Sequence, residues 1–293
     1  MLSPLIAKTF FGLEAVLADE LAALGAADVV QGRRMVAFRG DQRLMYRVNL
    51  CVRSAVRVLK PIATFTAADE KSLYDGIRQI DWRAHLDVDS SLAVDPVVHS
   101  TVFANSLFAA QRAKDAIVDQ FRRQHAERPS VDVDQPDVRV NVHLDRGHAI
   151  PAVTIGIDLA GTTLHHRGYR VATVKAPLKE NLACAVLLRA GWPAVAAQGG
   201  SLLDPLCGSG TLLIEGACMA VDSAPGLQRE MWGFLHWRGH DEDLWQGLLE
   251  EARERRAKRQ KTGQGSSVST GGAGSAASAR AAAATRGAHP STT

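Results

Sequence analysis

One stretch near the C-terminal end of the chain constrains the fold most. Residues 201–217 have the sequence SLLDPLCGSGTLLIEGA, in which an apolar run ends at Asp204, a turn contains Gly208 and Gly210, and an apolar helical pattern follows. Glycine lets a backbone pass close to a ligand where a Cβ would collide. The helix that follows directs unpaired N–H groups and the positive end of its dipole towards the turn. In an open α/β sheet, a turn at the carboxyl end of the first parallel strand is where nucleotides bind.

The residues missing from this turn narrow the choice of ligand. The sequence has no Gly-x-x-x-x-Gly-Lys-[Ser/Thr], so no lysine is placed to hold a triphosphate. Leu213 stands where the dinucleotide fingerprint requires its third glycine. A glycine turn with an acid at the strand end and no lysine suits S-adenosylmethionine, which carries no phosphate. A Gly-x-Gly by itself does not exclude the simpler interpretation, an ordinary strand–turn–helix corner that binds no ligand.

Composition sets the class of protein. The 293 residues allow two compact domains, and the 46% of hydrophobic residues contain no uninterrupted run long enough for a bilayer. The start Met1-Leu2-Ser3-Pro4 lacks the basic and apolar regions of a secretory signal, which predicts a cytoplasmic protein. Four cysteines without Cys-x-x-Cys spacing favour reduced thiols, and neither the acidic loop 131–137 nor the pair His165-His166 has metal-ligand spacing. We therefore expect no membrane and no metal; the oligomeric state stays undetermined.

Periodicity divides the chain before the glycine turn into two α/β patterns. The first, 1–55, alternates short apolar strands with helices, and the second, 56–160, contains the clearest amphipathic helix, 107–124. Two strands with period-two alternation, around Val138–Leu144 and Val153–Leu159, predict an antiparallel pair. A third unit, 161–261, contains the glycine turn. Residues 262–293 are almost entirely small or polar, which predicts a disordered tail.

The net charge of only +3 does not by itself indicate nucleic-acid binding, which needs cations gathered on one face. The helix 107–124 contains four of the basic residues that we select, and the strand after it contains a fifth. Arg167-Gly168-Tyr169-Arg170 forms a basic, aromatic turn, for which an RNA contact and a simple domain-linking turn are both open. The predicted RNA-binding residues are Arg112, Lys114, Arg122, Arg123, Arg139, Arg167 and Arg170.

Several ordered strings together resemble a known family. They are FGLE at 11–14, KDAIVD at 114–119, PDVRVNV at 136–142, the segment 164–170 and the motif 203–216. Their order over residues 1 to about 260 is similar to that in the bacterial 23S ribosomal RNA guanine-N2 methyltransferases that carry a THUMP domain. The resemblance implies a ferredoxin-like unit, a THUMP RNA-binding domain and the beginning of a Rossmann-like class I methyltransferase domain. It also implies that longer relatives carry a second methyltransferase domain.

The resemblance implies a cofactor site and an activity. S-adenosylmethionine would lie on the glycine turn, with the start of the preceding helix bordering it, and the activity would be methylation of the exocyclic N2 of a guanine in 23S ribosomal RNA. The implied cofactor-binding residues are Asp204, Pro205, Cys207, Gly208, Ser209, Gly210, Thr211, Lys179, Glu180 and Asn181. Glu215 is expected to pack on its helix or lie at its surface rather than act in catalysis.

Two expected parts of the family pattern are missing from the sequence. In the family, an Asn-Pro-Pro-Tyr loop holds the acceptor amine; this sequence has no counterpart, because no Asn-Pro or Pro-Pro pair occurs. The family also has an acid at the end of the second strand, which holds the cofactor ribose, and we expect the family pattern to stop before it. No catalytic residue can therefore be named. We expect a truncated or frame-shifted enzyme in which the family pattern ends near Lys261. The alternative function is a catalytically inactive chain that binds RNA through its THUMP domain.

Overall fold

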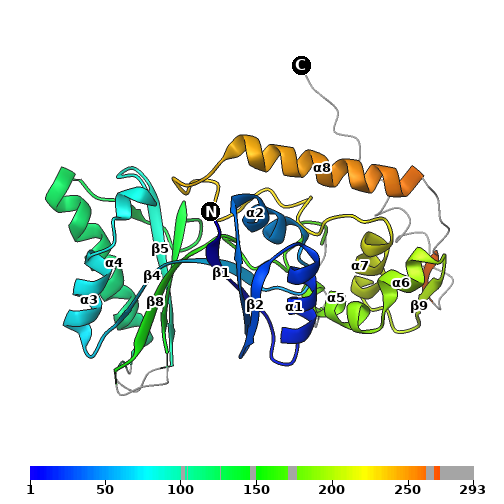
Figure 1. Cartoon of the computed structure of the whole chain (residues 1–293), viewed down its shortest axis with the longest axis horizontal. Coiled ribbons are helices and arrows are strands. Elements are labelled where there is room, and N and C mark those ends of the chain that lie inside the picture. The colour runs from blue at the N-terminus through cyan, green and yellow to red at the C-terminus, as the bar shows by residue number, and fades with distance from the viewer. Residues whose placement is uncertain are drawn as a thin grey trace. The chain divides into compact units, whose positions relative to one another are not determined.

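The computed structural model describes residues 1–99, 103, 105–125, 127–145, 150–170, 177–261 and 267–270, the side chains of 124, 125 and 267–270 excepted. The chain forms two compact units, and each is made of segments that are far apart in the sequence. The first unit contains 1–8, 57–163 and 231–242; the second contains 9–56, 164–230 and 243–293. Figure 1 shows the elements of both. No helix among the described residues is both long and apolar enough to cross a membrane.

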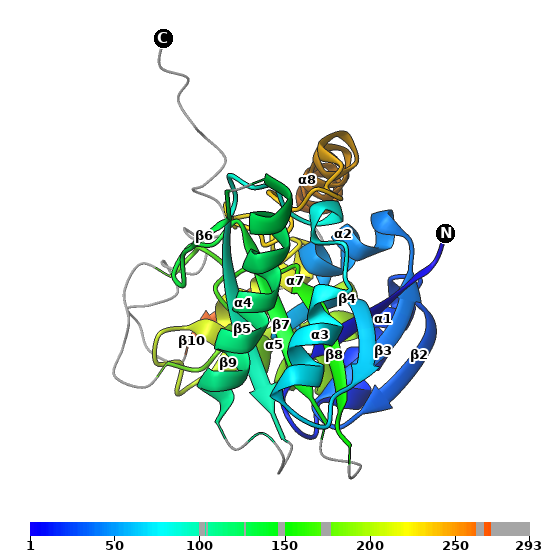
Figure 2. The ribbon, with the colours of Figure 1, turned by 90° about the vertical axis from the view of Figure 1, so that its left-hand side faces the viewer.

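The first unit is a sheet covered on one face by two helices. Its strands follow the order β1-β4-β8-β7-β5-β6, with β5 parallel to β7 and β6 and the other neighbours antiparallel. Helices α3 and α4 lie side by side across the sheet (Figure 2). The elements are β1 (Ser3–Lys8), β4 (Arg57–Thr66), α3 (Glu70–Arg78), a 3₁₀ turn (Trp82–Ala84), β5 (Ser91–Val98), α4 (Ser106–His125), β6 (Ser130–Val131), β7 (Val138–Leu144) and β8 (Ala152–Asp158).

The alternation of β7 fixes which face of that sheet is the core. Val138, Val140 and Val142 are fully buried, whereas the residues between them are partly exposed. This strand pairs antiparallel with β8, which confirms the pair predicted from period-two alternation. On the opposite face, Asp95 accepts from Arg139 at 3.0 Å. Arg57 pairs with Asp95 of β5 and Asp158 of β8, so this part of the sheet carries a group of ion pairs.

A backbone crossing joins the end of β8 to the segment 231–242. The amide of Gly233 donates to the carbonyl of Leu159 at 3.1 Å. A Cβ on Gly233 would lie 2.1 Å from the carbonyl oxygen of Asp158, and one on Gly161 would lie 2.9 Å from the amide of Gly233. Only glycine fits this approach of two backbones. The side chains of Trp232, Phe234 and Trp237, in the segment 231–242, are buried.

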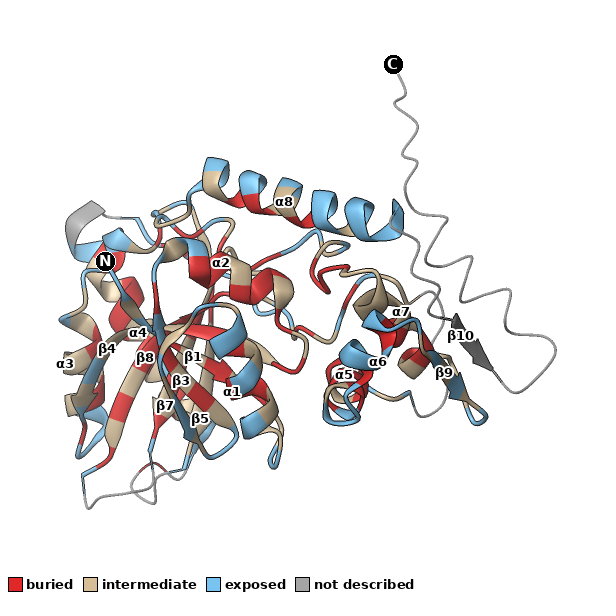
Figure 3. Ribbon diagram, turned by 45° about the vertical axis from the view of Figure 1, so that its right-hand side comes forward, coloured by how far each residue is buried: buried red, intermediate tan, exposed pale blue. Residues whose placement is uncertain are grey.

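The second unit combines a β-hairpin, helices and one parallel strand pair. Its elements are α1 (Glu14–Ala23), β2 (Ala27–Gly32), β3 (Met35–Gly40), α2 (Gln42–Cys51), α5 (Glu180–Arg189), α6 (Trp192–Ala197), β9 (Ser201–Asp204), α7 (Thr211–Ala220), α8 (Glu242–Lys261) and β10 (Ser267–Thr270). Helix α8 is buried on one side and exposed on the other (Figure 3). Its Trp245 contacts Tyr46 of α2 with ring centroids 5.8 Å apart.

The strand β10 corrects one expectation. Residues 262–293 were predicted to be disordered, but Ser267–Thr270 form a strand parallel to β9, with Thr270 opposite Asp204. Main-chain pairing needs no apolar side chains, so a low-complexity segment can still supply a strand. The rest of that segment, 262–266 and 271–293, lies outside the described residues.

Candidate cofactor site

The glycine turn has the local geometry that its sequence predicts. Strand β9 ends at Asp204, whose Oδ1 accepts from the amide of Leu206 at 3.0 Å and so closes the first part of the turn. Gly208 and Gly210 adopt positive φ values of 51° and 75°, which favour glycine. The carbonyl of Cys207 accepts from the amide of Gly210 at 2.7 Å, and α7 begins at the next residue.

The turn is open on the side of its glycines. A Cβ built on Gly208 would meet nothing within 4 Å, and one on Gly210 would meet only Ile214 Cδ1 at 4.0 Å. Pro205 and Gly208 are exposed, and no side-chain hydrogen bond caps the first turn of α7 among the described contacts. Bare peptide and helix amide groups are therefore available to a ligand here. The turn fits a cofactor that lies against its backbone.

The core behind the turn holds α7 against β9. Gly216 of α7 lies so close to the sheet that a Cβ would be 2.5 Å from Leu202 Cδ2. Its carbonyl accepts from Trp192 Nε1 at 2.8 Å, and Trp192 packs with Leu187 and Ala196 in a buried cluster. The start of α7 is therefore placed by packing, which keeps its amide groups in position behind the turn.

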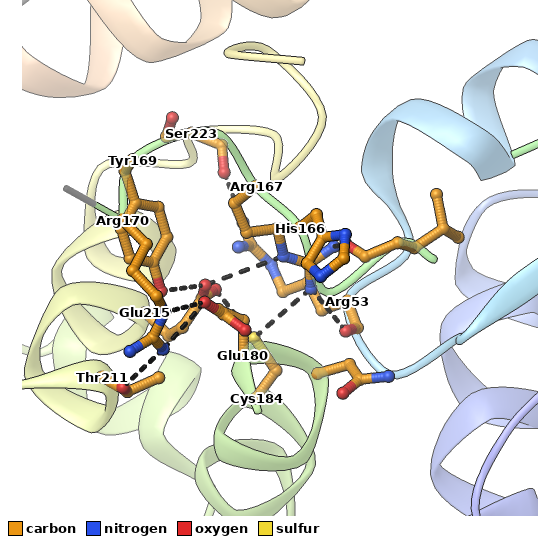
Figure 4. Close-up of polar contacts among 12 residues, drawn as sticks. Arg53, His166, Arg167, Tyr169, Arg170, Glu180, Cys184, Thr211, Glu215 and Ser223 are labelled. Atoms are coloured by element: carbon orange, nitrogen blue, oxygen red, sulfur yellow. Dashed lines mark hydrogen bonds and ion pairs between the residues drawn. The ribbon is translucent and has the colours of Figure 1, made fainter. Parts of the chain in front are cut away.

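Arg170 joins the turn to the start of α5. Its Nε donates to Glu180 Oε1 at 2.9 Å, and its Nη2 lies 2.8 Å from the same oxygen. Nη2 also donates to the carbonyl of Leu178 at 3.2 Å and to Thr211 Oγ1 at 3.1 Å, while Nη1 donates to Ser209 Oγ at 3.3 Å. Figure 4 shows Glu180 and Thr211 beside the guanidinium. The two halves of the predicted cofactor set are thus brought together by a residue that was predicted to bind RNA.

The three predicted residues at the start of α5 face different surroundings. Lys179 is exposed, with its Nζ 5.6 Å from the ring centre of Phe10. Glu180 is buried against Arg170. Asn181 is fully buried and donates from Nδ2 to the carbonyl of Ala55 at 3.2 Å, so it packs inside the unit instead of bordering an open site.

A buried polar cluster lies behind the turn, centred on Glu215. Its Oε1 accepts from Tyr169 Oη at 2.8 Å, and its Oε2 accepts from Cys184 Sγ at 2.9 Å (Figure 4). Burial, together with the carboxylate of Glu215, raises the pKa values of both Tyr169 and Cys184. Both groups therefore keep the protons that they donate. Glu215 is buried, so the helix-packing alternative for it is confirmed and the surface alternative is not.

Arginines complete this cluster. Arg167 is only 3% exposed, donates to the carbonyl oxygens of Leu164 and Arg53 at 2.7 Å each, and lies 3.7 Å from Glu215. A guanidinium so buried has no surface to offer RNA, which corrects the RNA contact predicted for Arg167. Arg53 in turn donates to the carbonyl of Ser223 at 2.8 Å.

One signal in the sequence points to this cluster. Glu215 is the only charged residue in the apolar helix TLLIEGACMA, and an acid there needs buried partners. Its partners could not be identified from sequence, because Tyr169 and Cys184 lie in other elements of the unit.

The remaining predicted RNA-binding residues lie in the first unit. Lys114 pairs with Asp115 at 3.0 Å and Arg122 with Asp119 at 3.6 Å, while Arg123 is exposed. Arg112, also on α4, lies 5.4 Å from the ring centre of Tyr74. Arg139 does not join them, because it lies on the sheet face opposite the helices and is paired with Asp95. Of these remaining residues, α4 therefore carries all but Arg139, and two of its cations pair with acids of the same helix.

Three family models match the chain. They are described as the RlmL ferredoxin-like domain, over residues 4–59, the THUMP domain, over 67–153, and the RMKL-like methyltransferase domain, over 167–276. The fold class predicted from sequence is confirmed by these matches. The methyltransferase match runs to residue 276, so the expectation that the family pattern ends near Lys261 is wrong.

The chain is similar to two proteins named ribosomal RNA large subunit methyltransferase K/L. The one from Syntrophotalea carbinolica is 51% identical over 245 residues, and the one from Methylococcus capsulatus is 52% identical over 244. The alignments cover 84% and 83% of this chain but 34% and 32% of those proteins. The chain thus spans about a third of the length of the curated relatives it matches.

Solved structures match a larger share of their own chains. A protein from Listeria monocytogenes, described as a predicted N6-adenine-specific DNA methylase, superimposes with a TM-score of 0.75 at 29% identity, covering 87% of this chain and 64% of its own. SMU.472, described as a methyltransferase and crystallised with SAH, gives a TM-score of 0.73 at 26% identity, covering 92% and 75%.

Proposed function

Since this chain belongs to the RlmKL-like methyltransferases with a THUMP domain, we propose that it binds S-adenosylmethionine and ribosomal RNA. The reaction we propose is methylation of the exocyclic N2 of a guanine in 23S ribosomal RNA. The observation that carries the cofactor part is the open glycine turn, 205–210, at the end of β9. We further propose the domain boundaries 1–55 and 56–160, with a methyltransferase domain that begins at 161, and a cytoplasmic location.

The residues at the turn could hold one side of the cofactor. S-adenosylmethionine supplies an activated methyl group when it is bound. The peptide at Gly208 and Gly210 would let the ligand approach the backbone, and the first amides of α7 would donate hydrogen bonds to it. Lys179, exposed at the start of α5, would offer a cation to a carboxylate. Strand β10 pairs parallel with β9 and no Asp or Glu follows it in the sequence, so we assign no residue to the cofactor ribose.

Catalysis by such a site is mainly positioning, with the acceptor amine held in line with the methyl group. The chain has no Asn-Pro-Pro-Tyr segment to hold that amine, so we assign no catalytic residue. RNA would be held by the first unit, in which α4 presents Arg112, Lys114, Arg122 and Arg123. Such a surface recognises RNA by shape and backbone rather than by base edges in a groove.

One observation favours a second candidate function. The THUMP model matches residues 67–153, and this supports RNA binding independently of the glycine turn. In this alternative the chain binds RNA through its THUMP domain and does not methylate.

Calorimetric titration of the whole purified chain with S-adenosylmethionine and with S-adenosylhomocysteine separates the two candidates. Micromolar affinity supports cofactor use, and the absence of binding at millimolar ligand leaves only the RNA-binding function. Binding to 23S ribosomal RNA fragments, measured at several salt concentrations, tests the part that both candidates share. Affinity should fall steeply with salt, because phosphate contacts release counterions.

A further inference from the structure

One arginine joins the cofactor turn to the starts of α5 and α7. Arg170 contacts Ser209 at the end of the turn, Thr211 at the start of α7, and Leu178 and Glu180 at the start of α5. A guanidinium has five N–H donors in a fixed planar fork, so one side chain can hold several acceptors in a set geometry. We call this set of contacts the clamp; Figure 4 shows its residues Arg170, Glu180 and Thr211.

The clamp has a second layer that keeps its orientation. Glu180 is only 4% exposed and accepts from two nitrogens of Arg170 through one oxygen. Ser209 and Thr211 also lie 3.2 Å apart through their hydroxyl oxygens, so they form one acceptor pair for the arginine. A buried carboxylate on one side and two hydroxyls on the other fix the guanidinium between α5 and the turn.

The contacts of Arg170 lie next to the glycines of the turn, which have no side chains to restrain the backbone. Gly208 has open space at its Cβ position, and Gly210 nearly so, so neither side chain nor packing holds that part of the turn. The nearest side-chain anchors after the glycines are the hydroxyls that Arg170 contacts. Loss of these contacts would free the turn without removing the core packing of Trp192 against Gly216.

We infer that Arg170 is a positioning residue, which holds the glycine turn in the shape that the cofactor requires. The inference rests on the proposed cofactor use for its effect on binding, but not for its effect on the turn itself. Arg170 is not an RNA contact in this assignment, because its donors are engaged by Glu180, Leu178, Ser209 and Thr211.

The test replaces Arg170 by lysine in the whole chain. Arg170→Lys keeps a positive charge beside Glu180, but a single ammonium cannot span the acceptors on both sides. The matched control is Arg189→Lys, in the same unit, where an exposed arginine donates to the carbonyl of Gly12 at 3.0 Å. A second variant, Ser209→Ala with Thr211→Val, removes the acceptors at the turn and leaves the Arg170–Glu180 pair intact.

Hydrogen exchange measured by mass spectrometry, without ligand, gives the direct reading. Exchange of amides 206–211 should become about tenfold faster in Arg170→Lys and in the double variant, and stay unchanged in Arg189→Lys. Exchange of amides in α1 and α2, which lie in the same unit away from the turn, should stay that of the wild type, which distinguishes a local effect on the turn from general destabilisation. Unchanged exchange at 206–211 in both test variants would overturn the inference.

Titration with S-adenosylhomocysteine then measures the consequence for binding. The dissociation constant should rise about tenfold in Arg170→Lys and remain that of the wild type in Arg189→Lys. If the wild-type chain binds no S-adenosylhomocysteine, the proposed cofactor use fails, while the exchange result still decides whether Arg170 shapes the turn. Equal affinity of wild type and Arg170→Lys, with measurable binding, would contradict the positioning role.

Discussion

Replacing Tyr169 by phenylalanine tests whether the cluster around Glu215 stabilises the second unit. The change removes one hydroxyl, which donates to Glu215 Oε1 at 2.8 Å, and leaves the ring in place. A hydrogen bond to a charged group is worth about 1.5–3 kcal/mol. Because Tyr169 is partly exposed and water can replace the hydroxyl, we expect the lower end, about 1.5 kcal/mol. The midpoint of thermal unfolding should fall by roughly 3–6 °C, at about 2–4 °C per kcal/mol for this size.

The matched control is Tyr74→Phe in the first unit. Tyr74 donates to Asp119 at 2.7 Å, so the chemistry is the same, but that carboxylate is 36% exposed. Water can replace the hydroxyl at a solvated carboxylate, so Tyr74→Phe should lower the free energy of unfolding by less than about 0.5 kcal/mol. Calorimetry of both variants measures the two costs. Equal costs would refute the argument that burial of Glu215 makes its hydrogen bond valuable.

The pH dependence gives the same prediction a second check. Burial and Glu215 raise the pKa of Tyr169, so the folded state keeps its proton at a pH where the unfolded chain loses one. This contribution is complete below the unfolded pKa of about 10 and is lost as the pH rises above it. Urea unfolding at pH 7.5 and 10.5 should therefore show the gap between wild type and Tyr169→Phe narrowing at the higher pH. A gap that widens would contradict the shift.

Three further predictions concern other parts of the chain. Burial first, and the charge of Lys8 second, lower the pKa of His143 to about 4, so the unfolded chain binds a proton at a pH where the folded chain does not. The free energy of unfolding should therefore fall as the pH drops from 6.5 to 4, and calorimetry should show a smaller fall for His143→Gln. Iodoacetamide should label Cys207 first, as peptide mapping would show, because burial raises the thiol pKa values of Cys51, Cys184 and Cys218. Arg122→Glu with Arg123→Glu should flatten the salt dependence of RNA binding by about one to two units of slope, whereas Lys71→Glu on α3 should not.

Local patterns predicted the elements that depend on neighbouring residues. The alternation from Val138 to Leu144 predicted both a strand and its buried face. The order of apolar run, acid and glycines predicted the turn after Asp204 and the helix beginning at Thr211. Period and glycine placement determine backbone conformation within a few residues, which is why these predictions succeeded.

The contacts of charged residues could not be predicted in the same way. Arg167 and Arg170 are close in the sequence, and both were predicted to bind RNA, yet one is buried in the Glu215 cluster and the other clamps the turn. Their partners, at 180, 209, 211 and 215, come from other elements, and a single sequence contains no signal for such pairs. The strand at 267–270 was missed for a related reason, since its pairing uses the main chain.

The glycine crossing at residues 161 and 233 affects how a fragment of this protein can be made. The first unit is discontinuous, so cutting the chain at linear domain boundaries would separate β1 and the segment 231–242 from the rest of that unit. Trp232, Phe234 and Trp237 would leave with that segment, exposing the apolar surface they cover. An excised RNA-binding fragment should therefore aggregate unless the aromatic segment is grafted back through a short linker after Thr163.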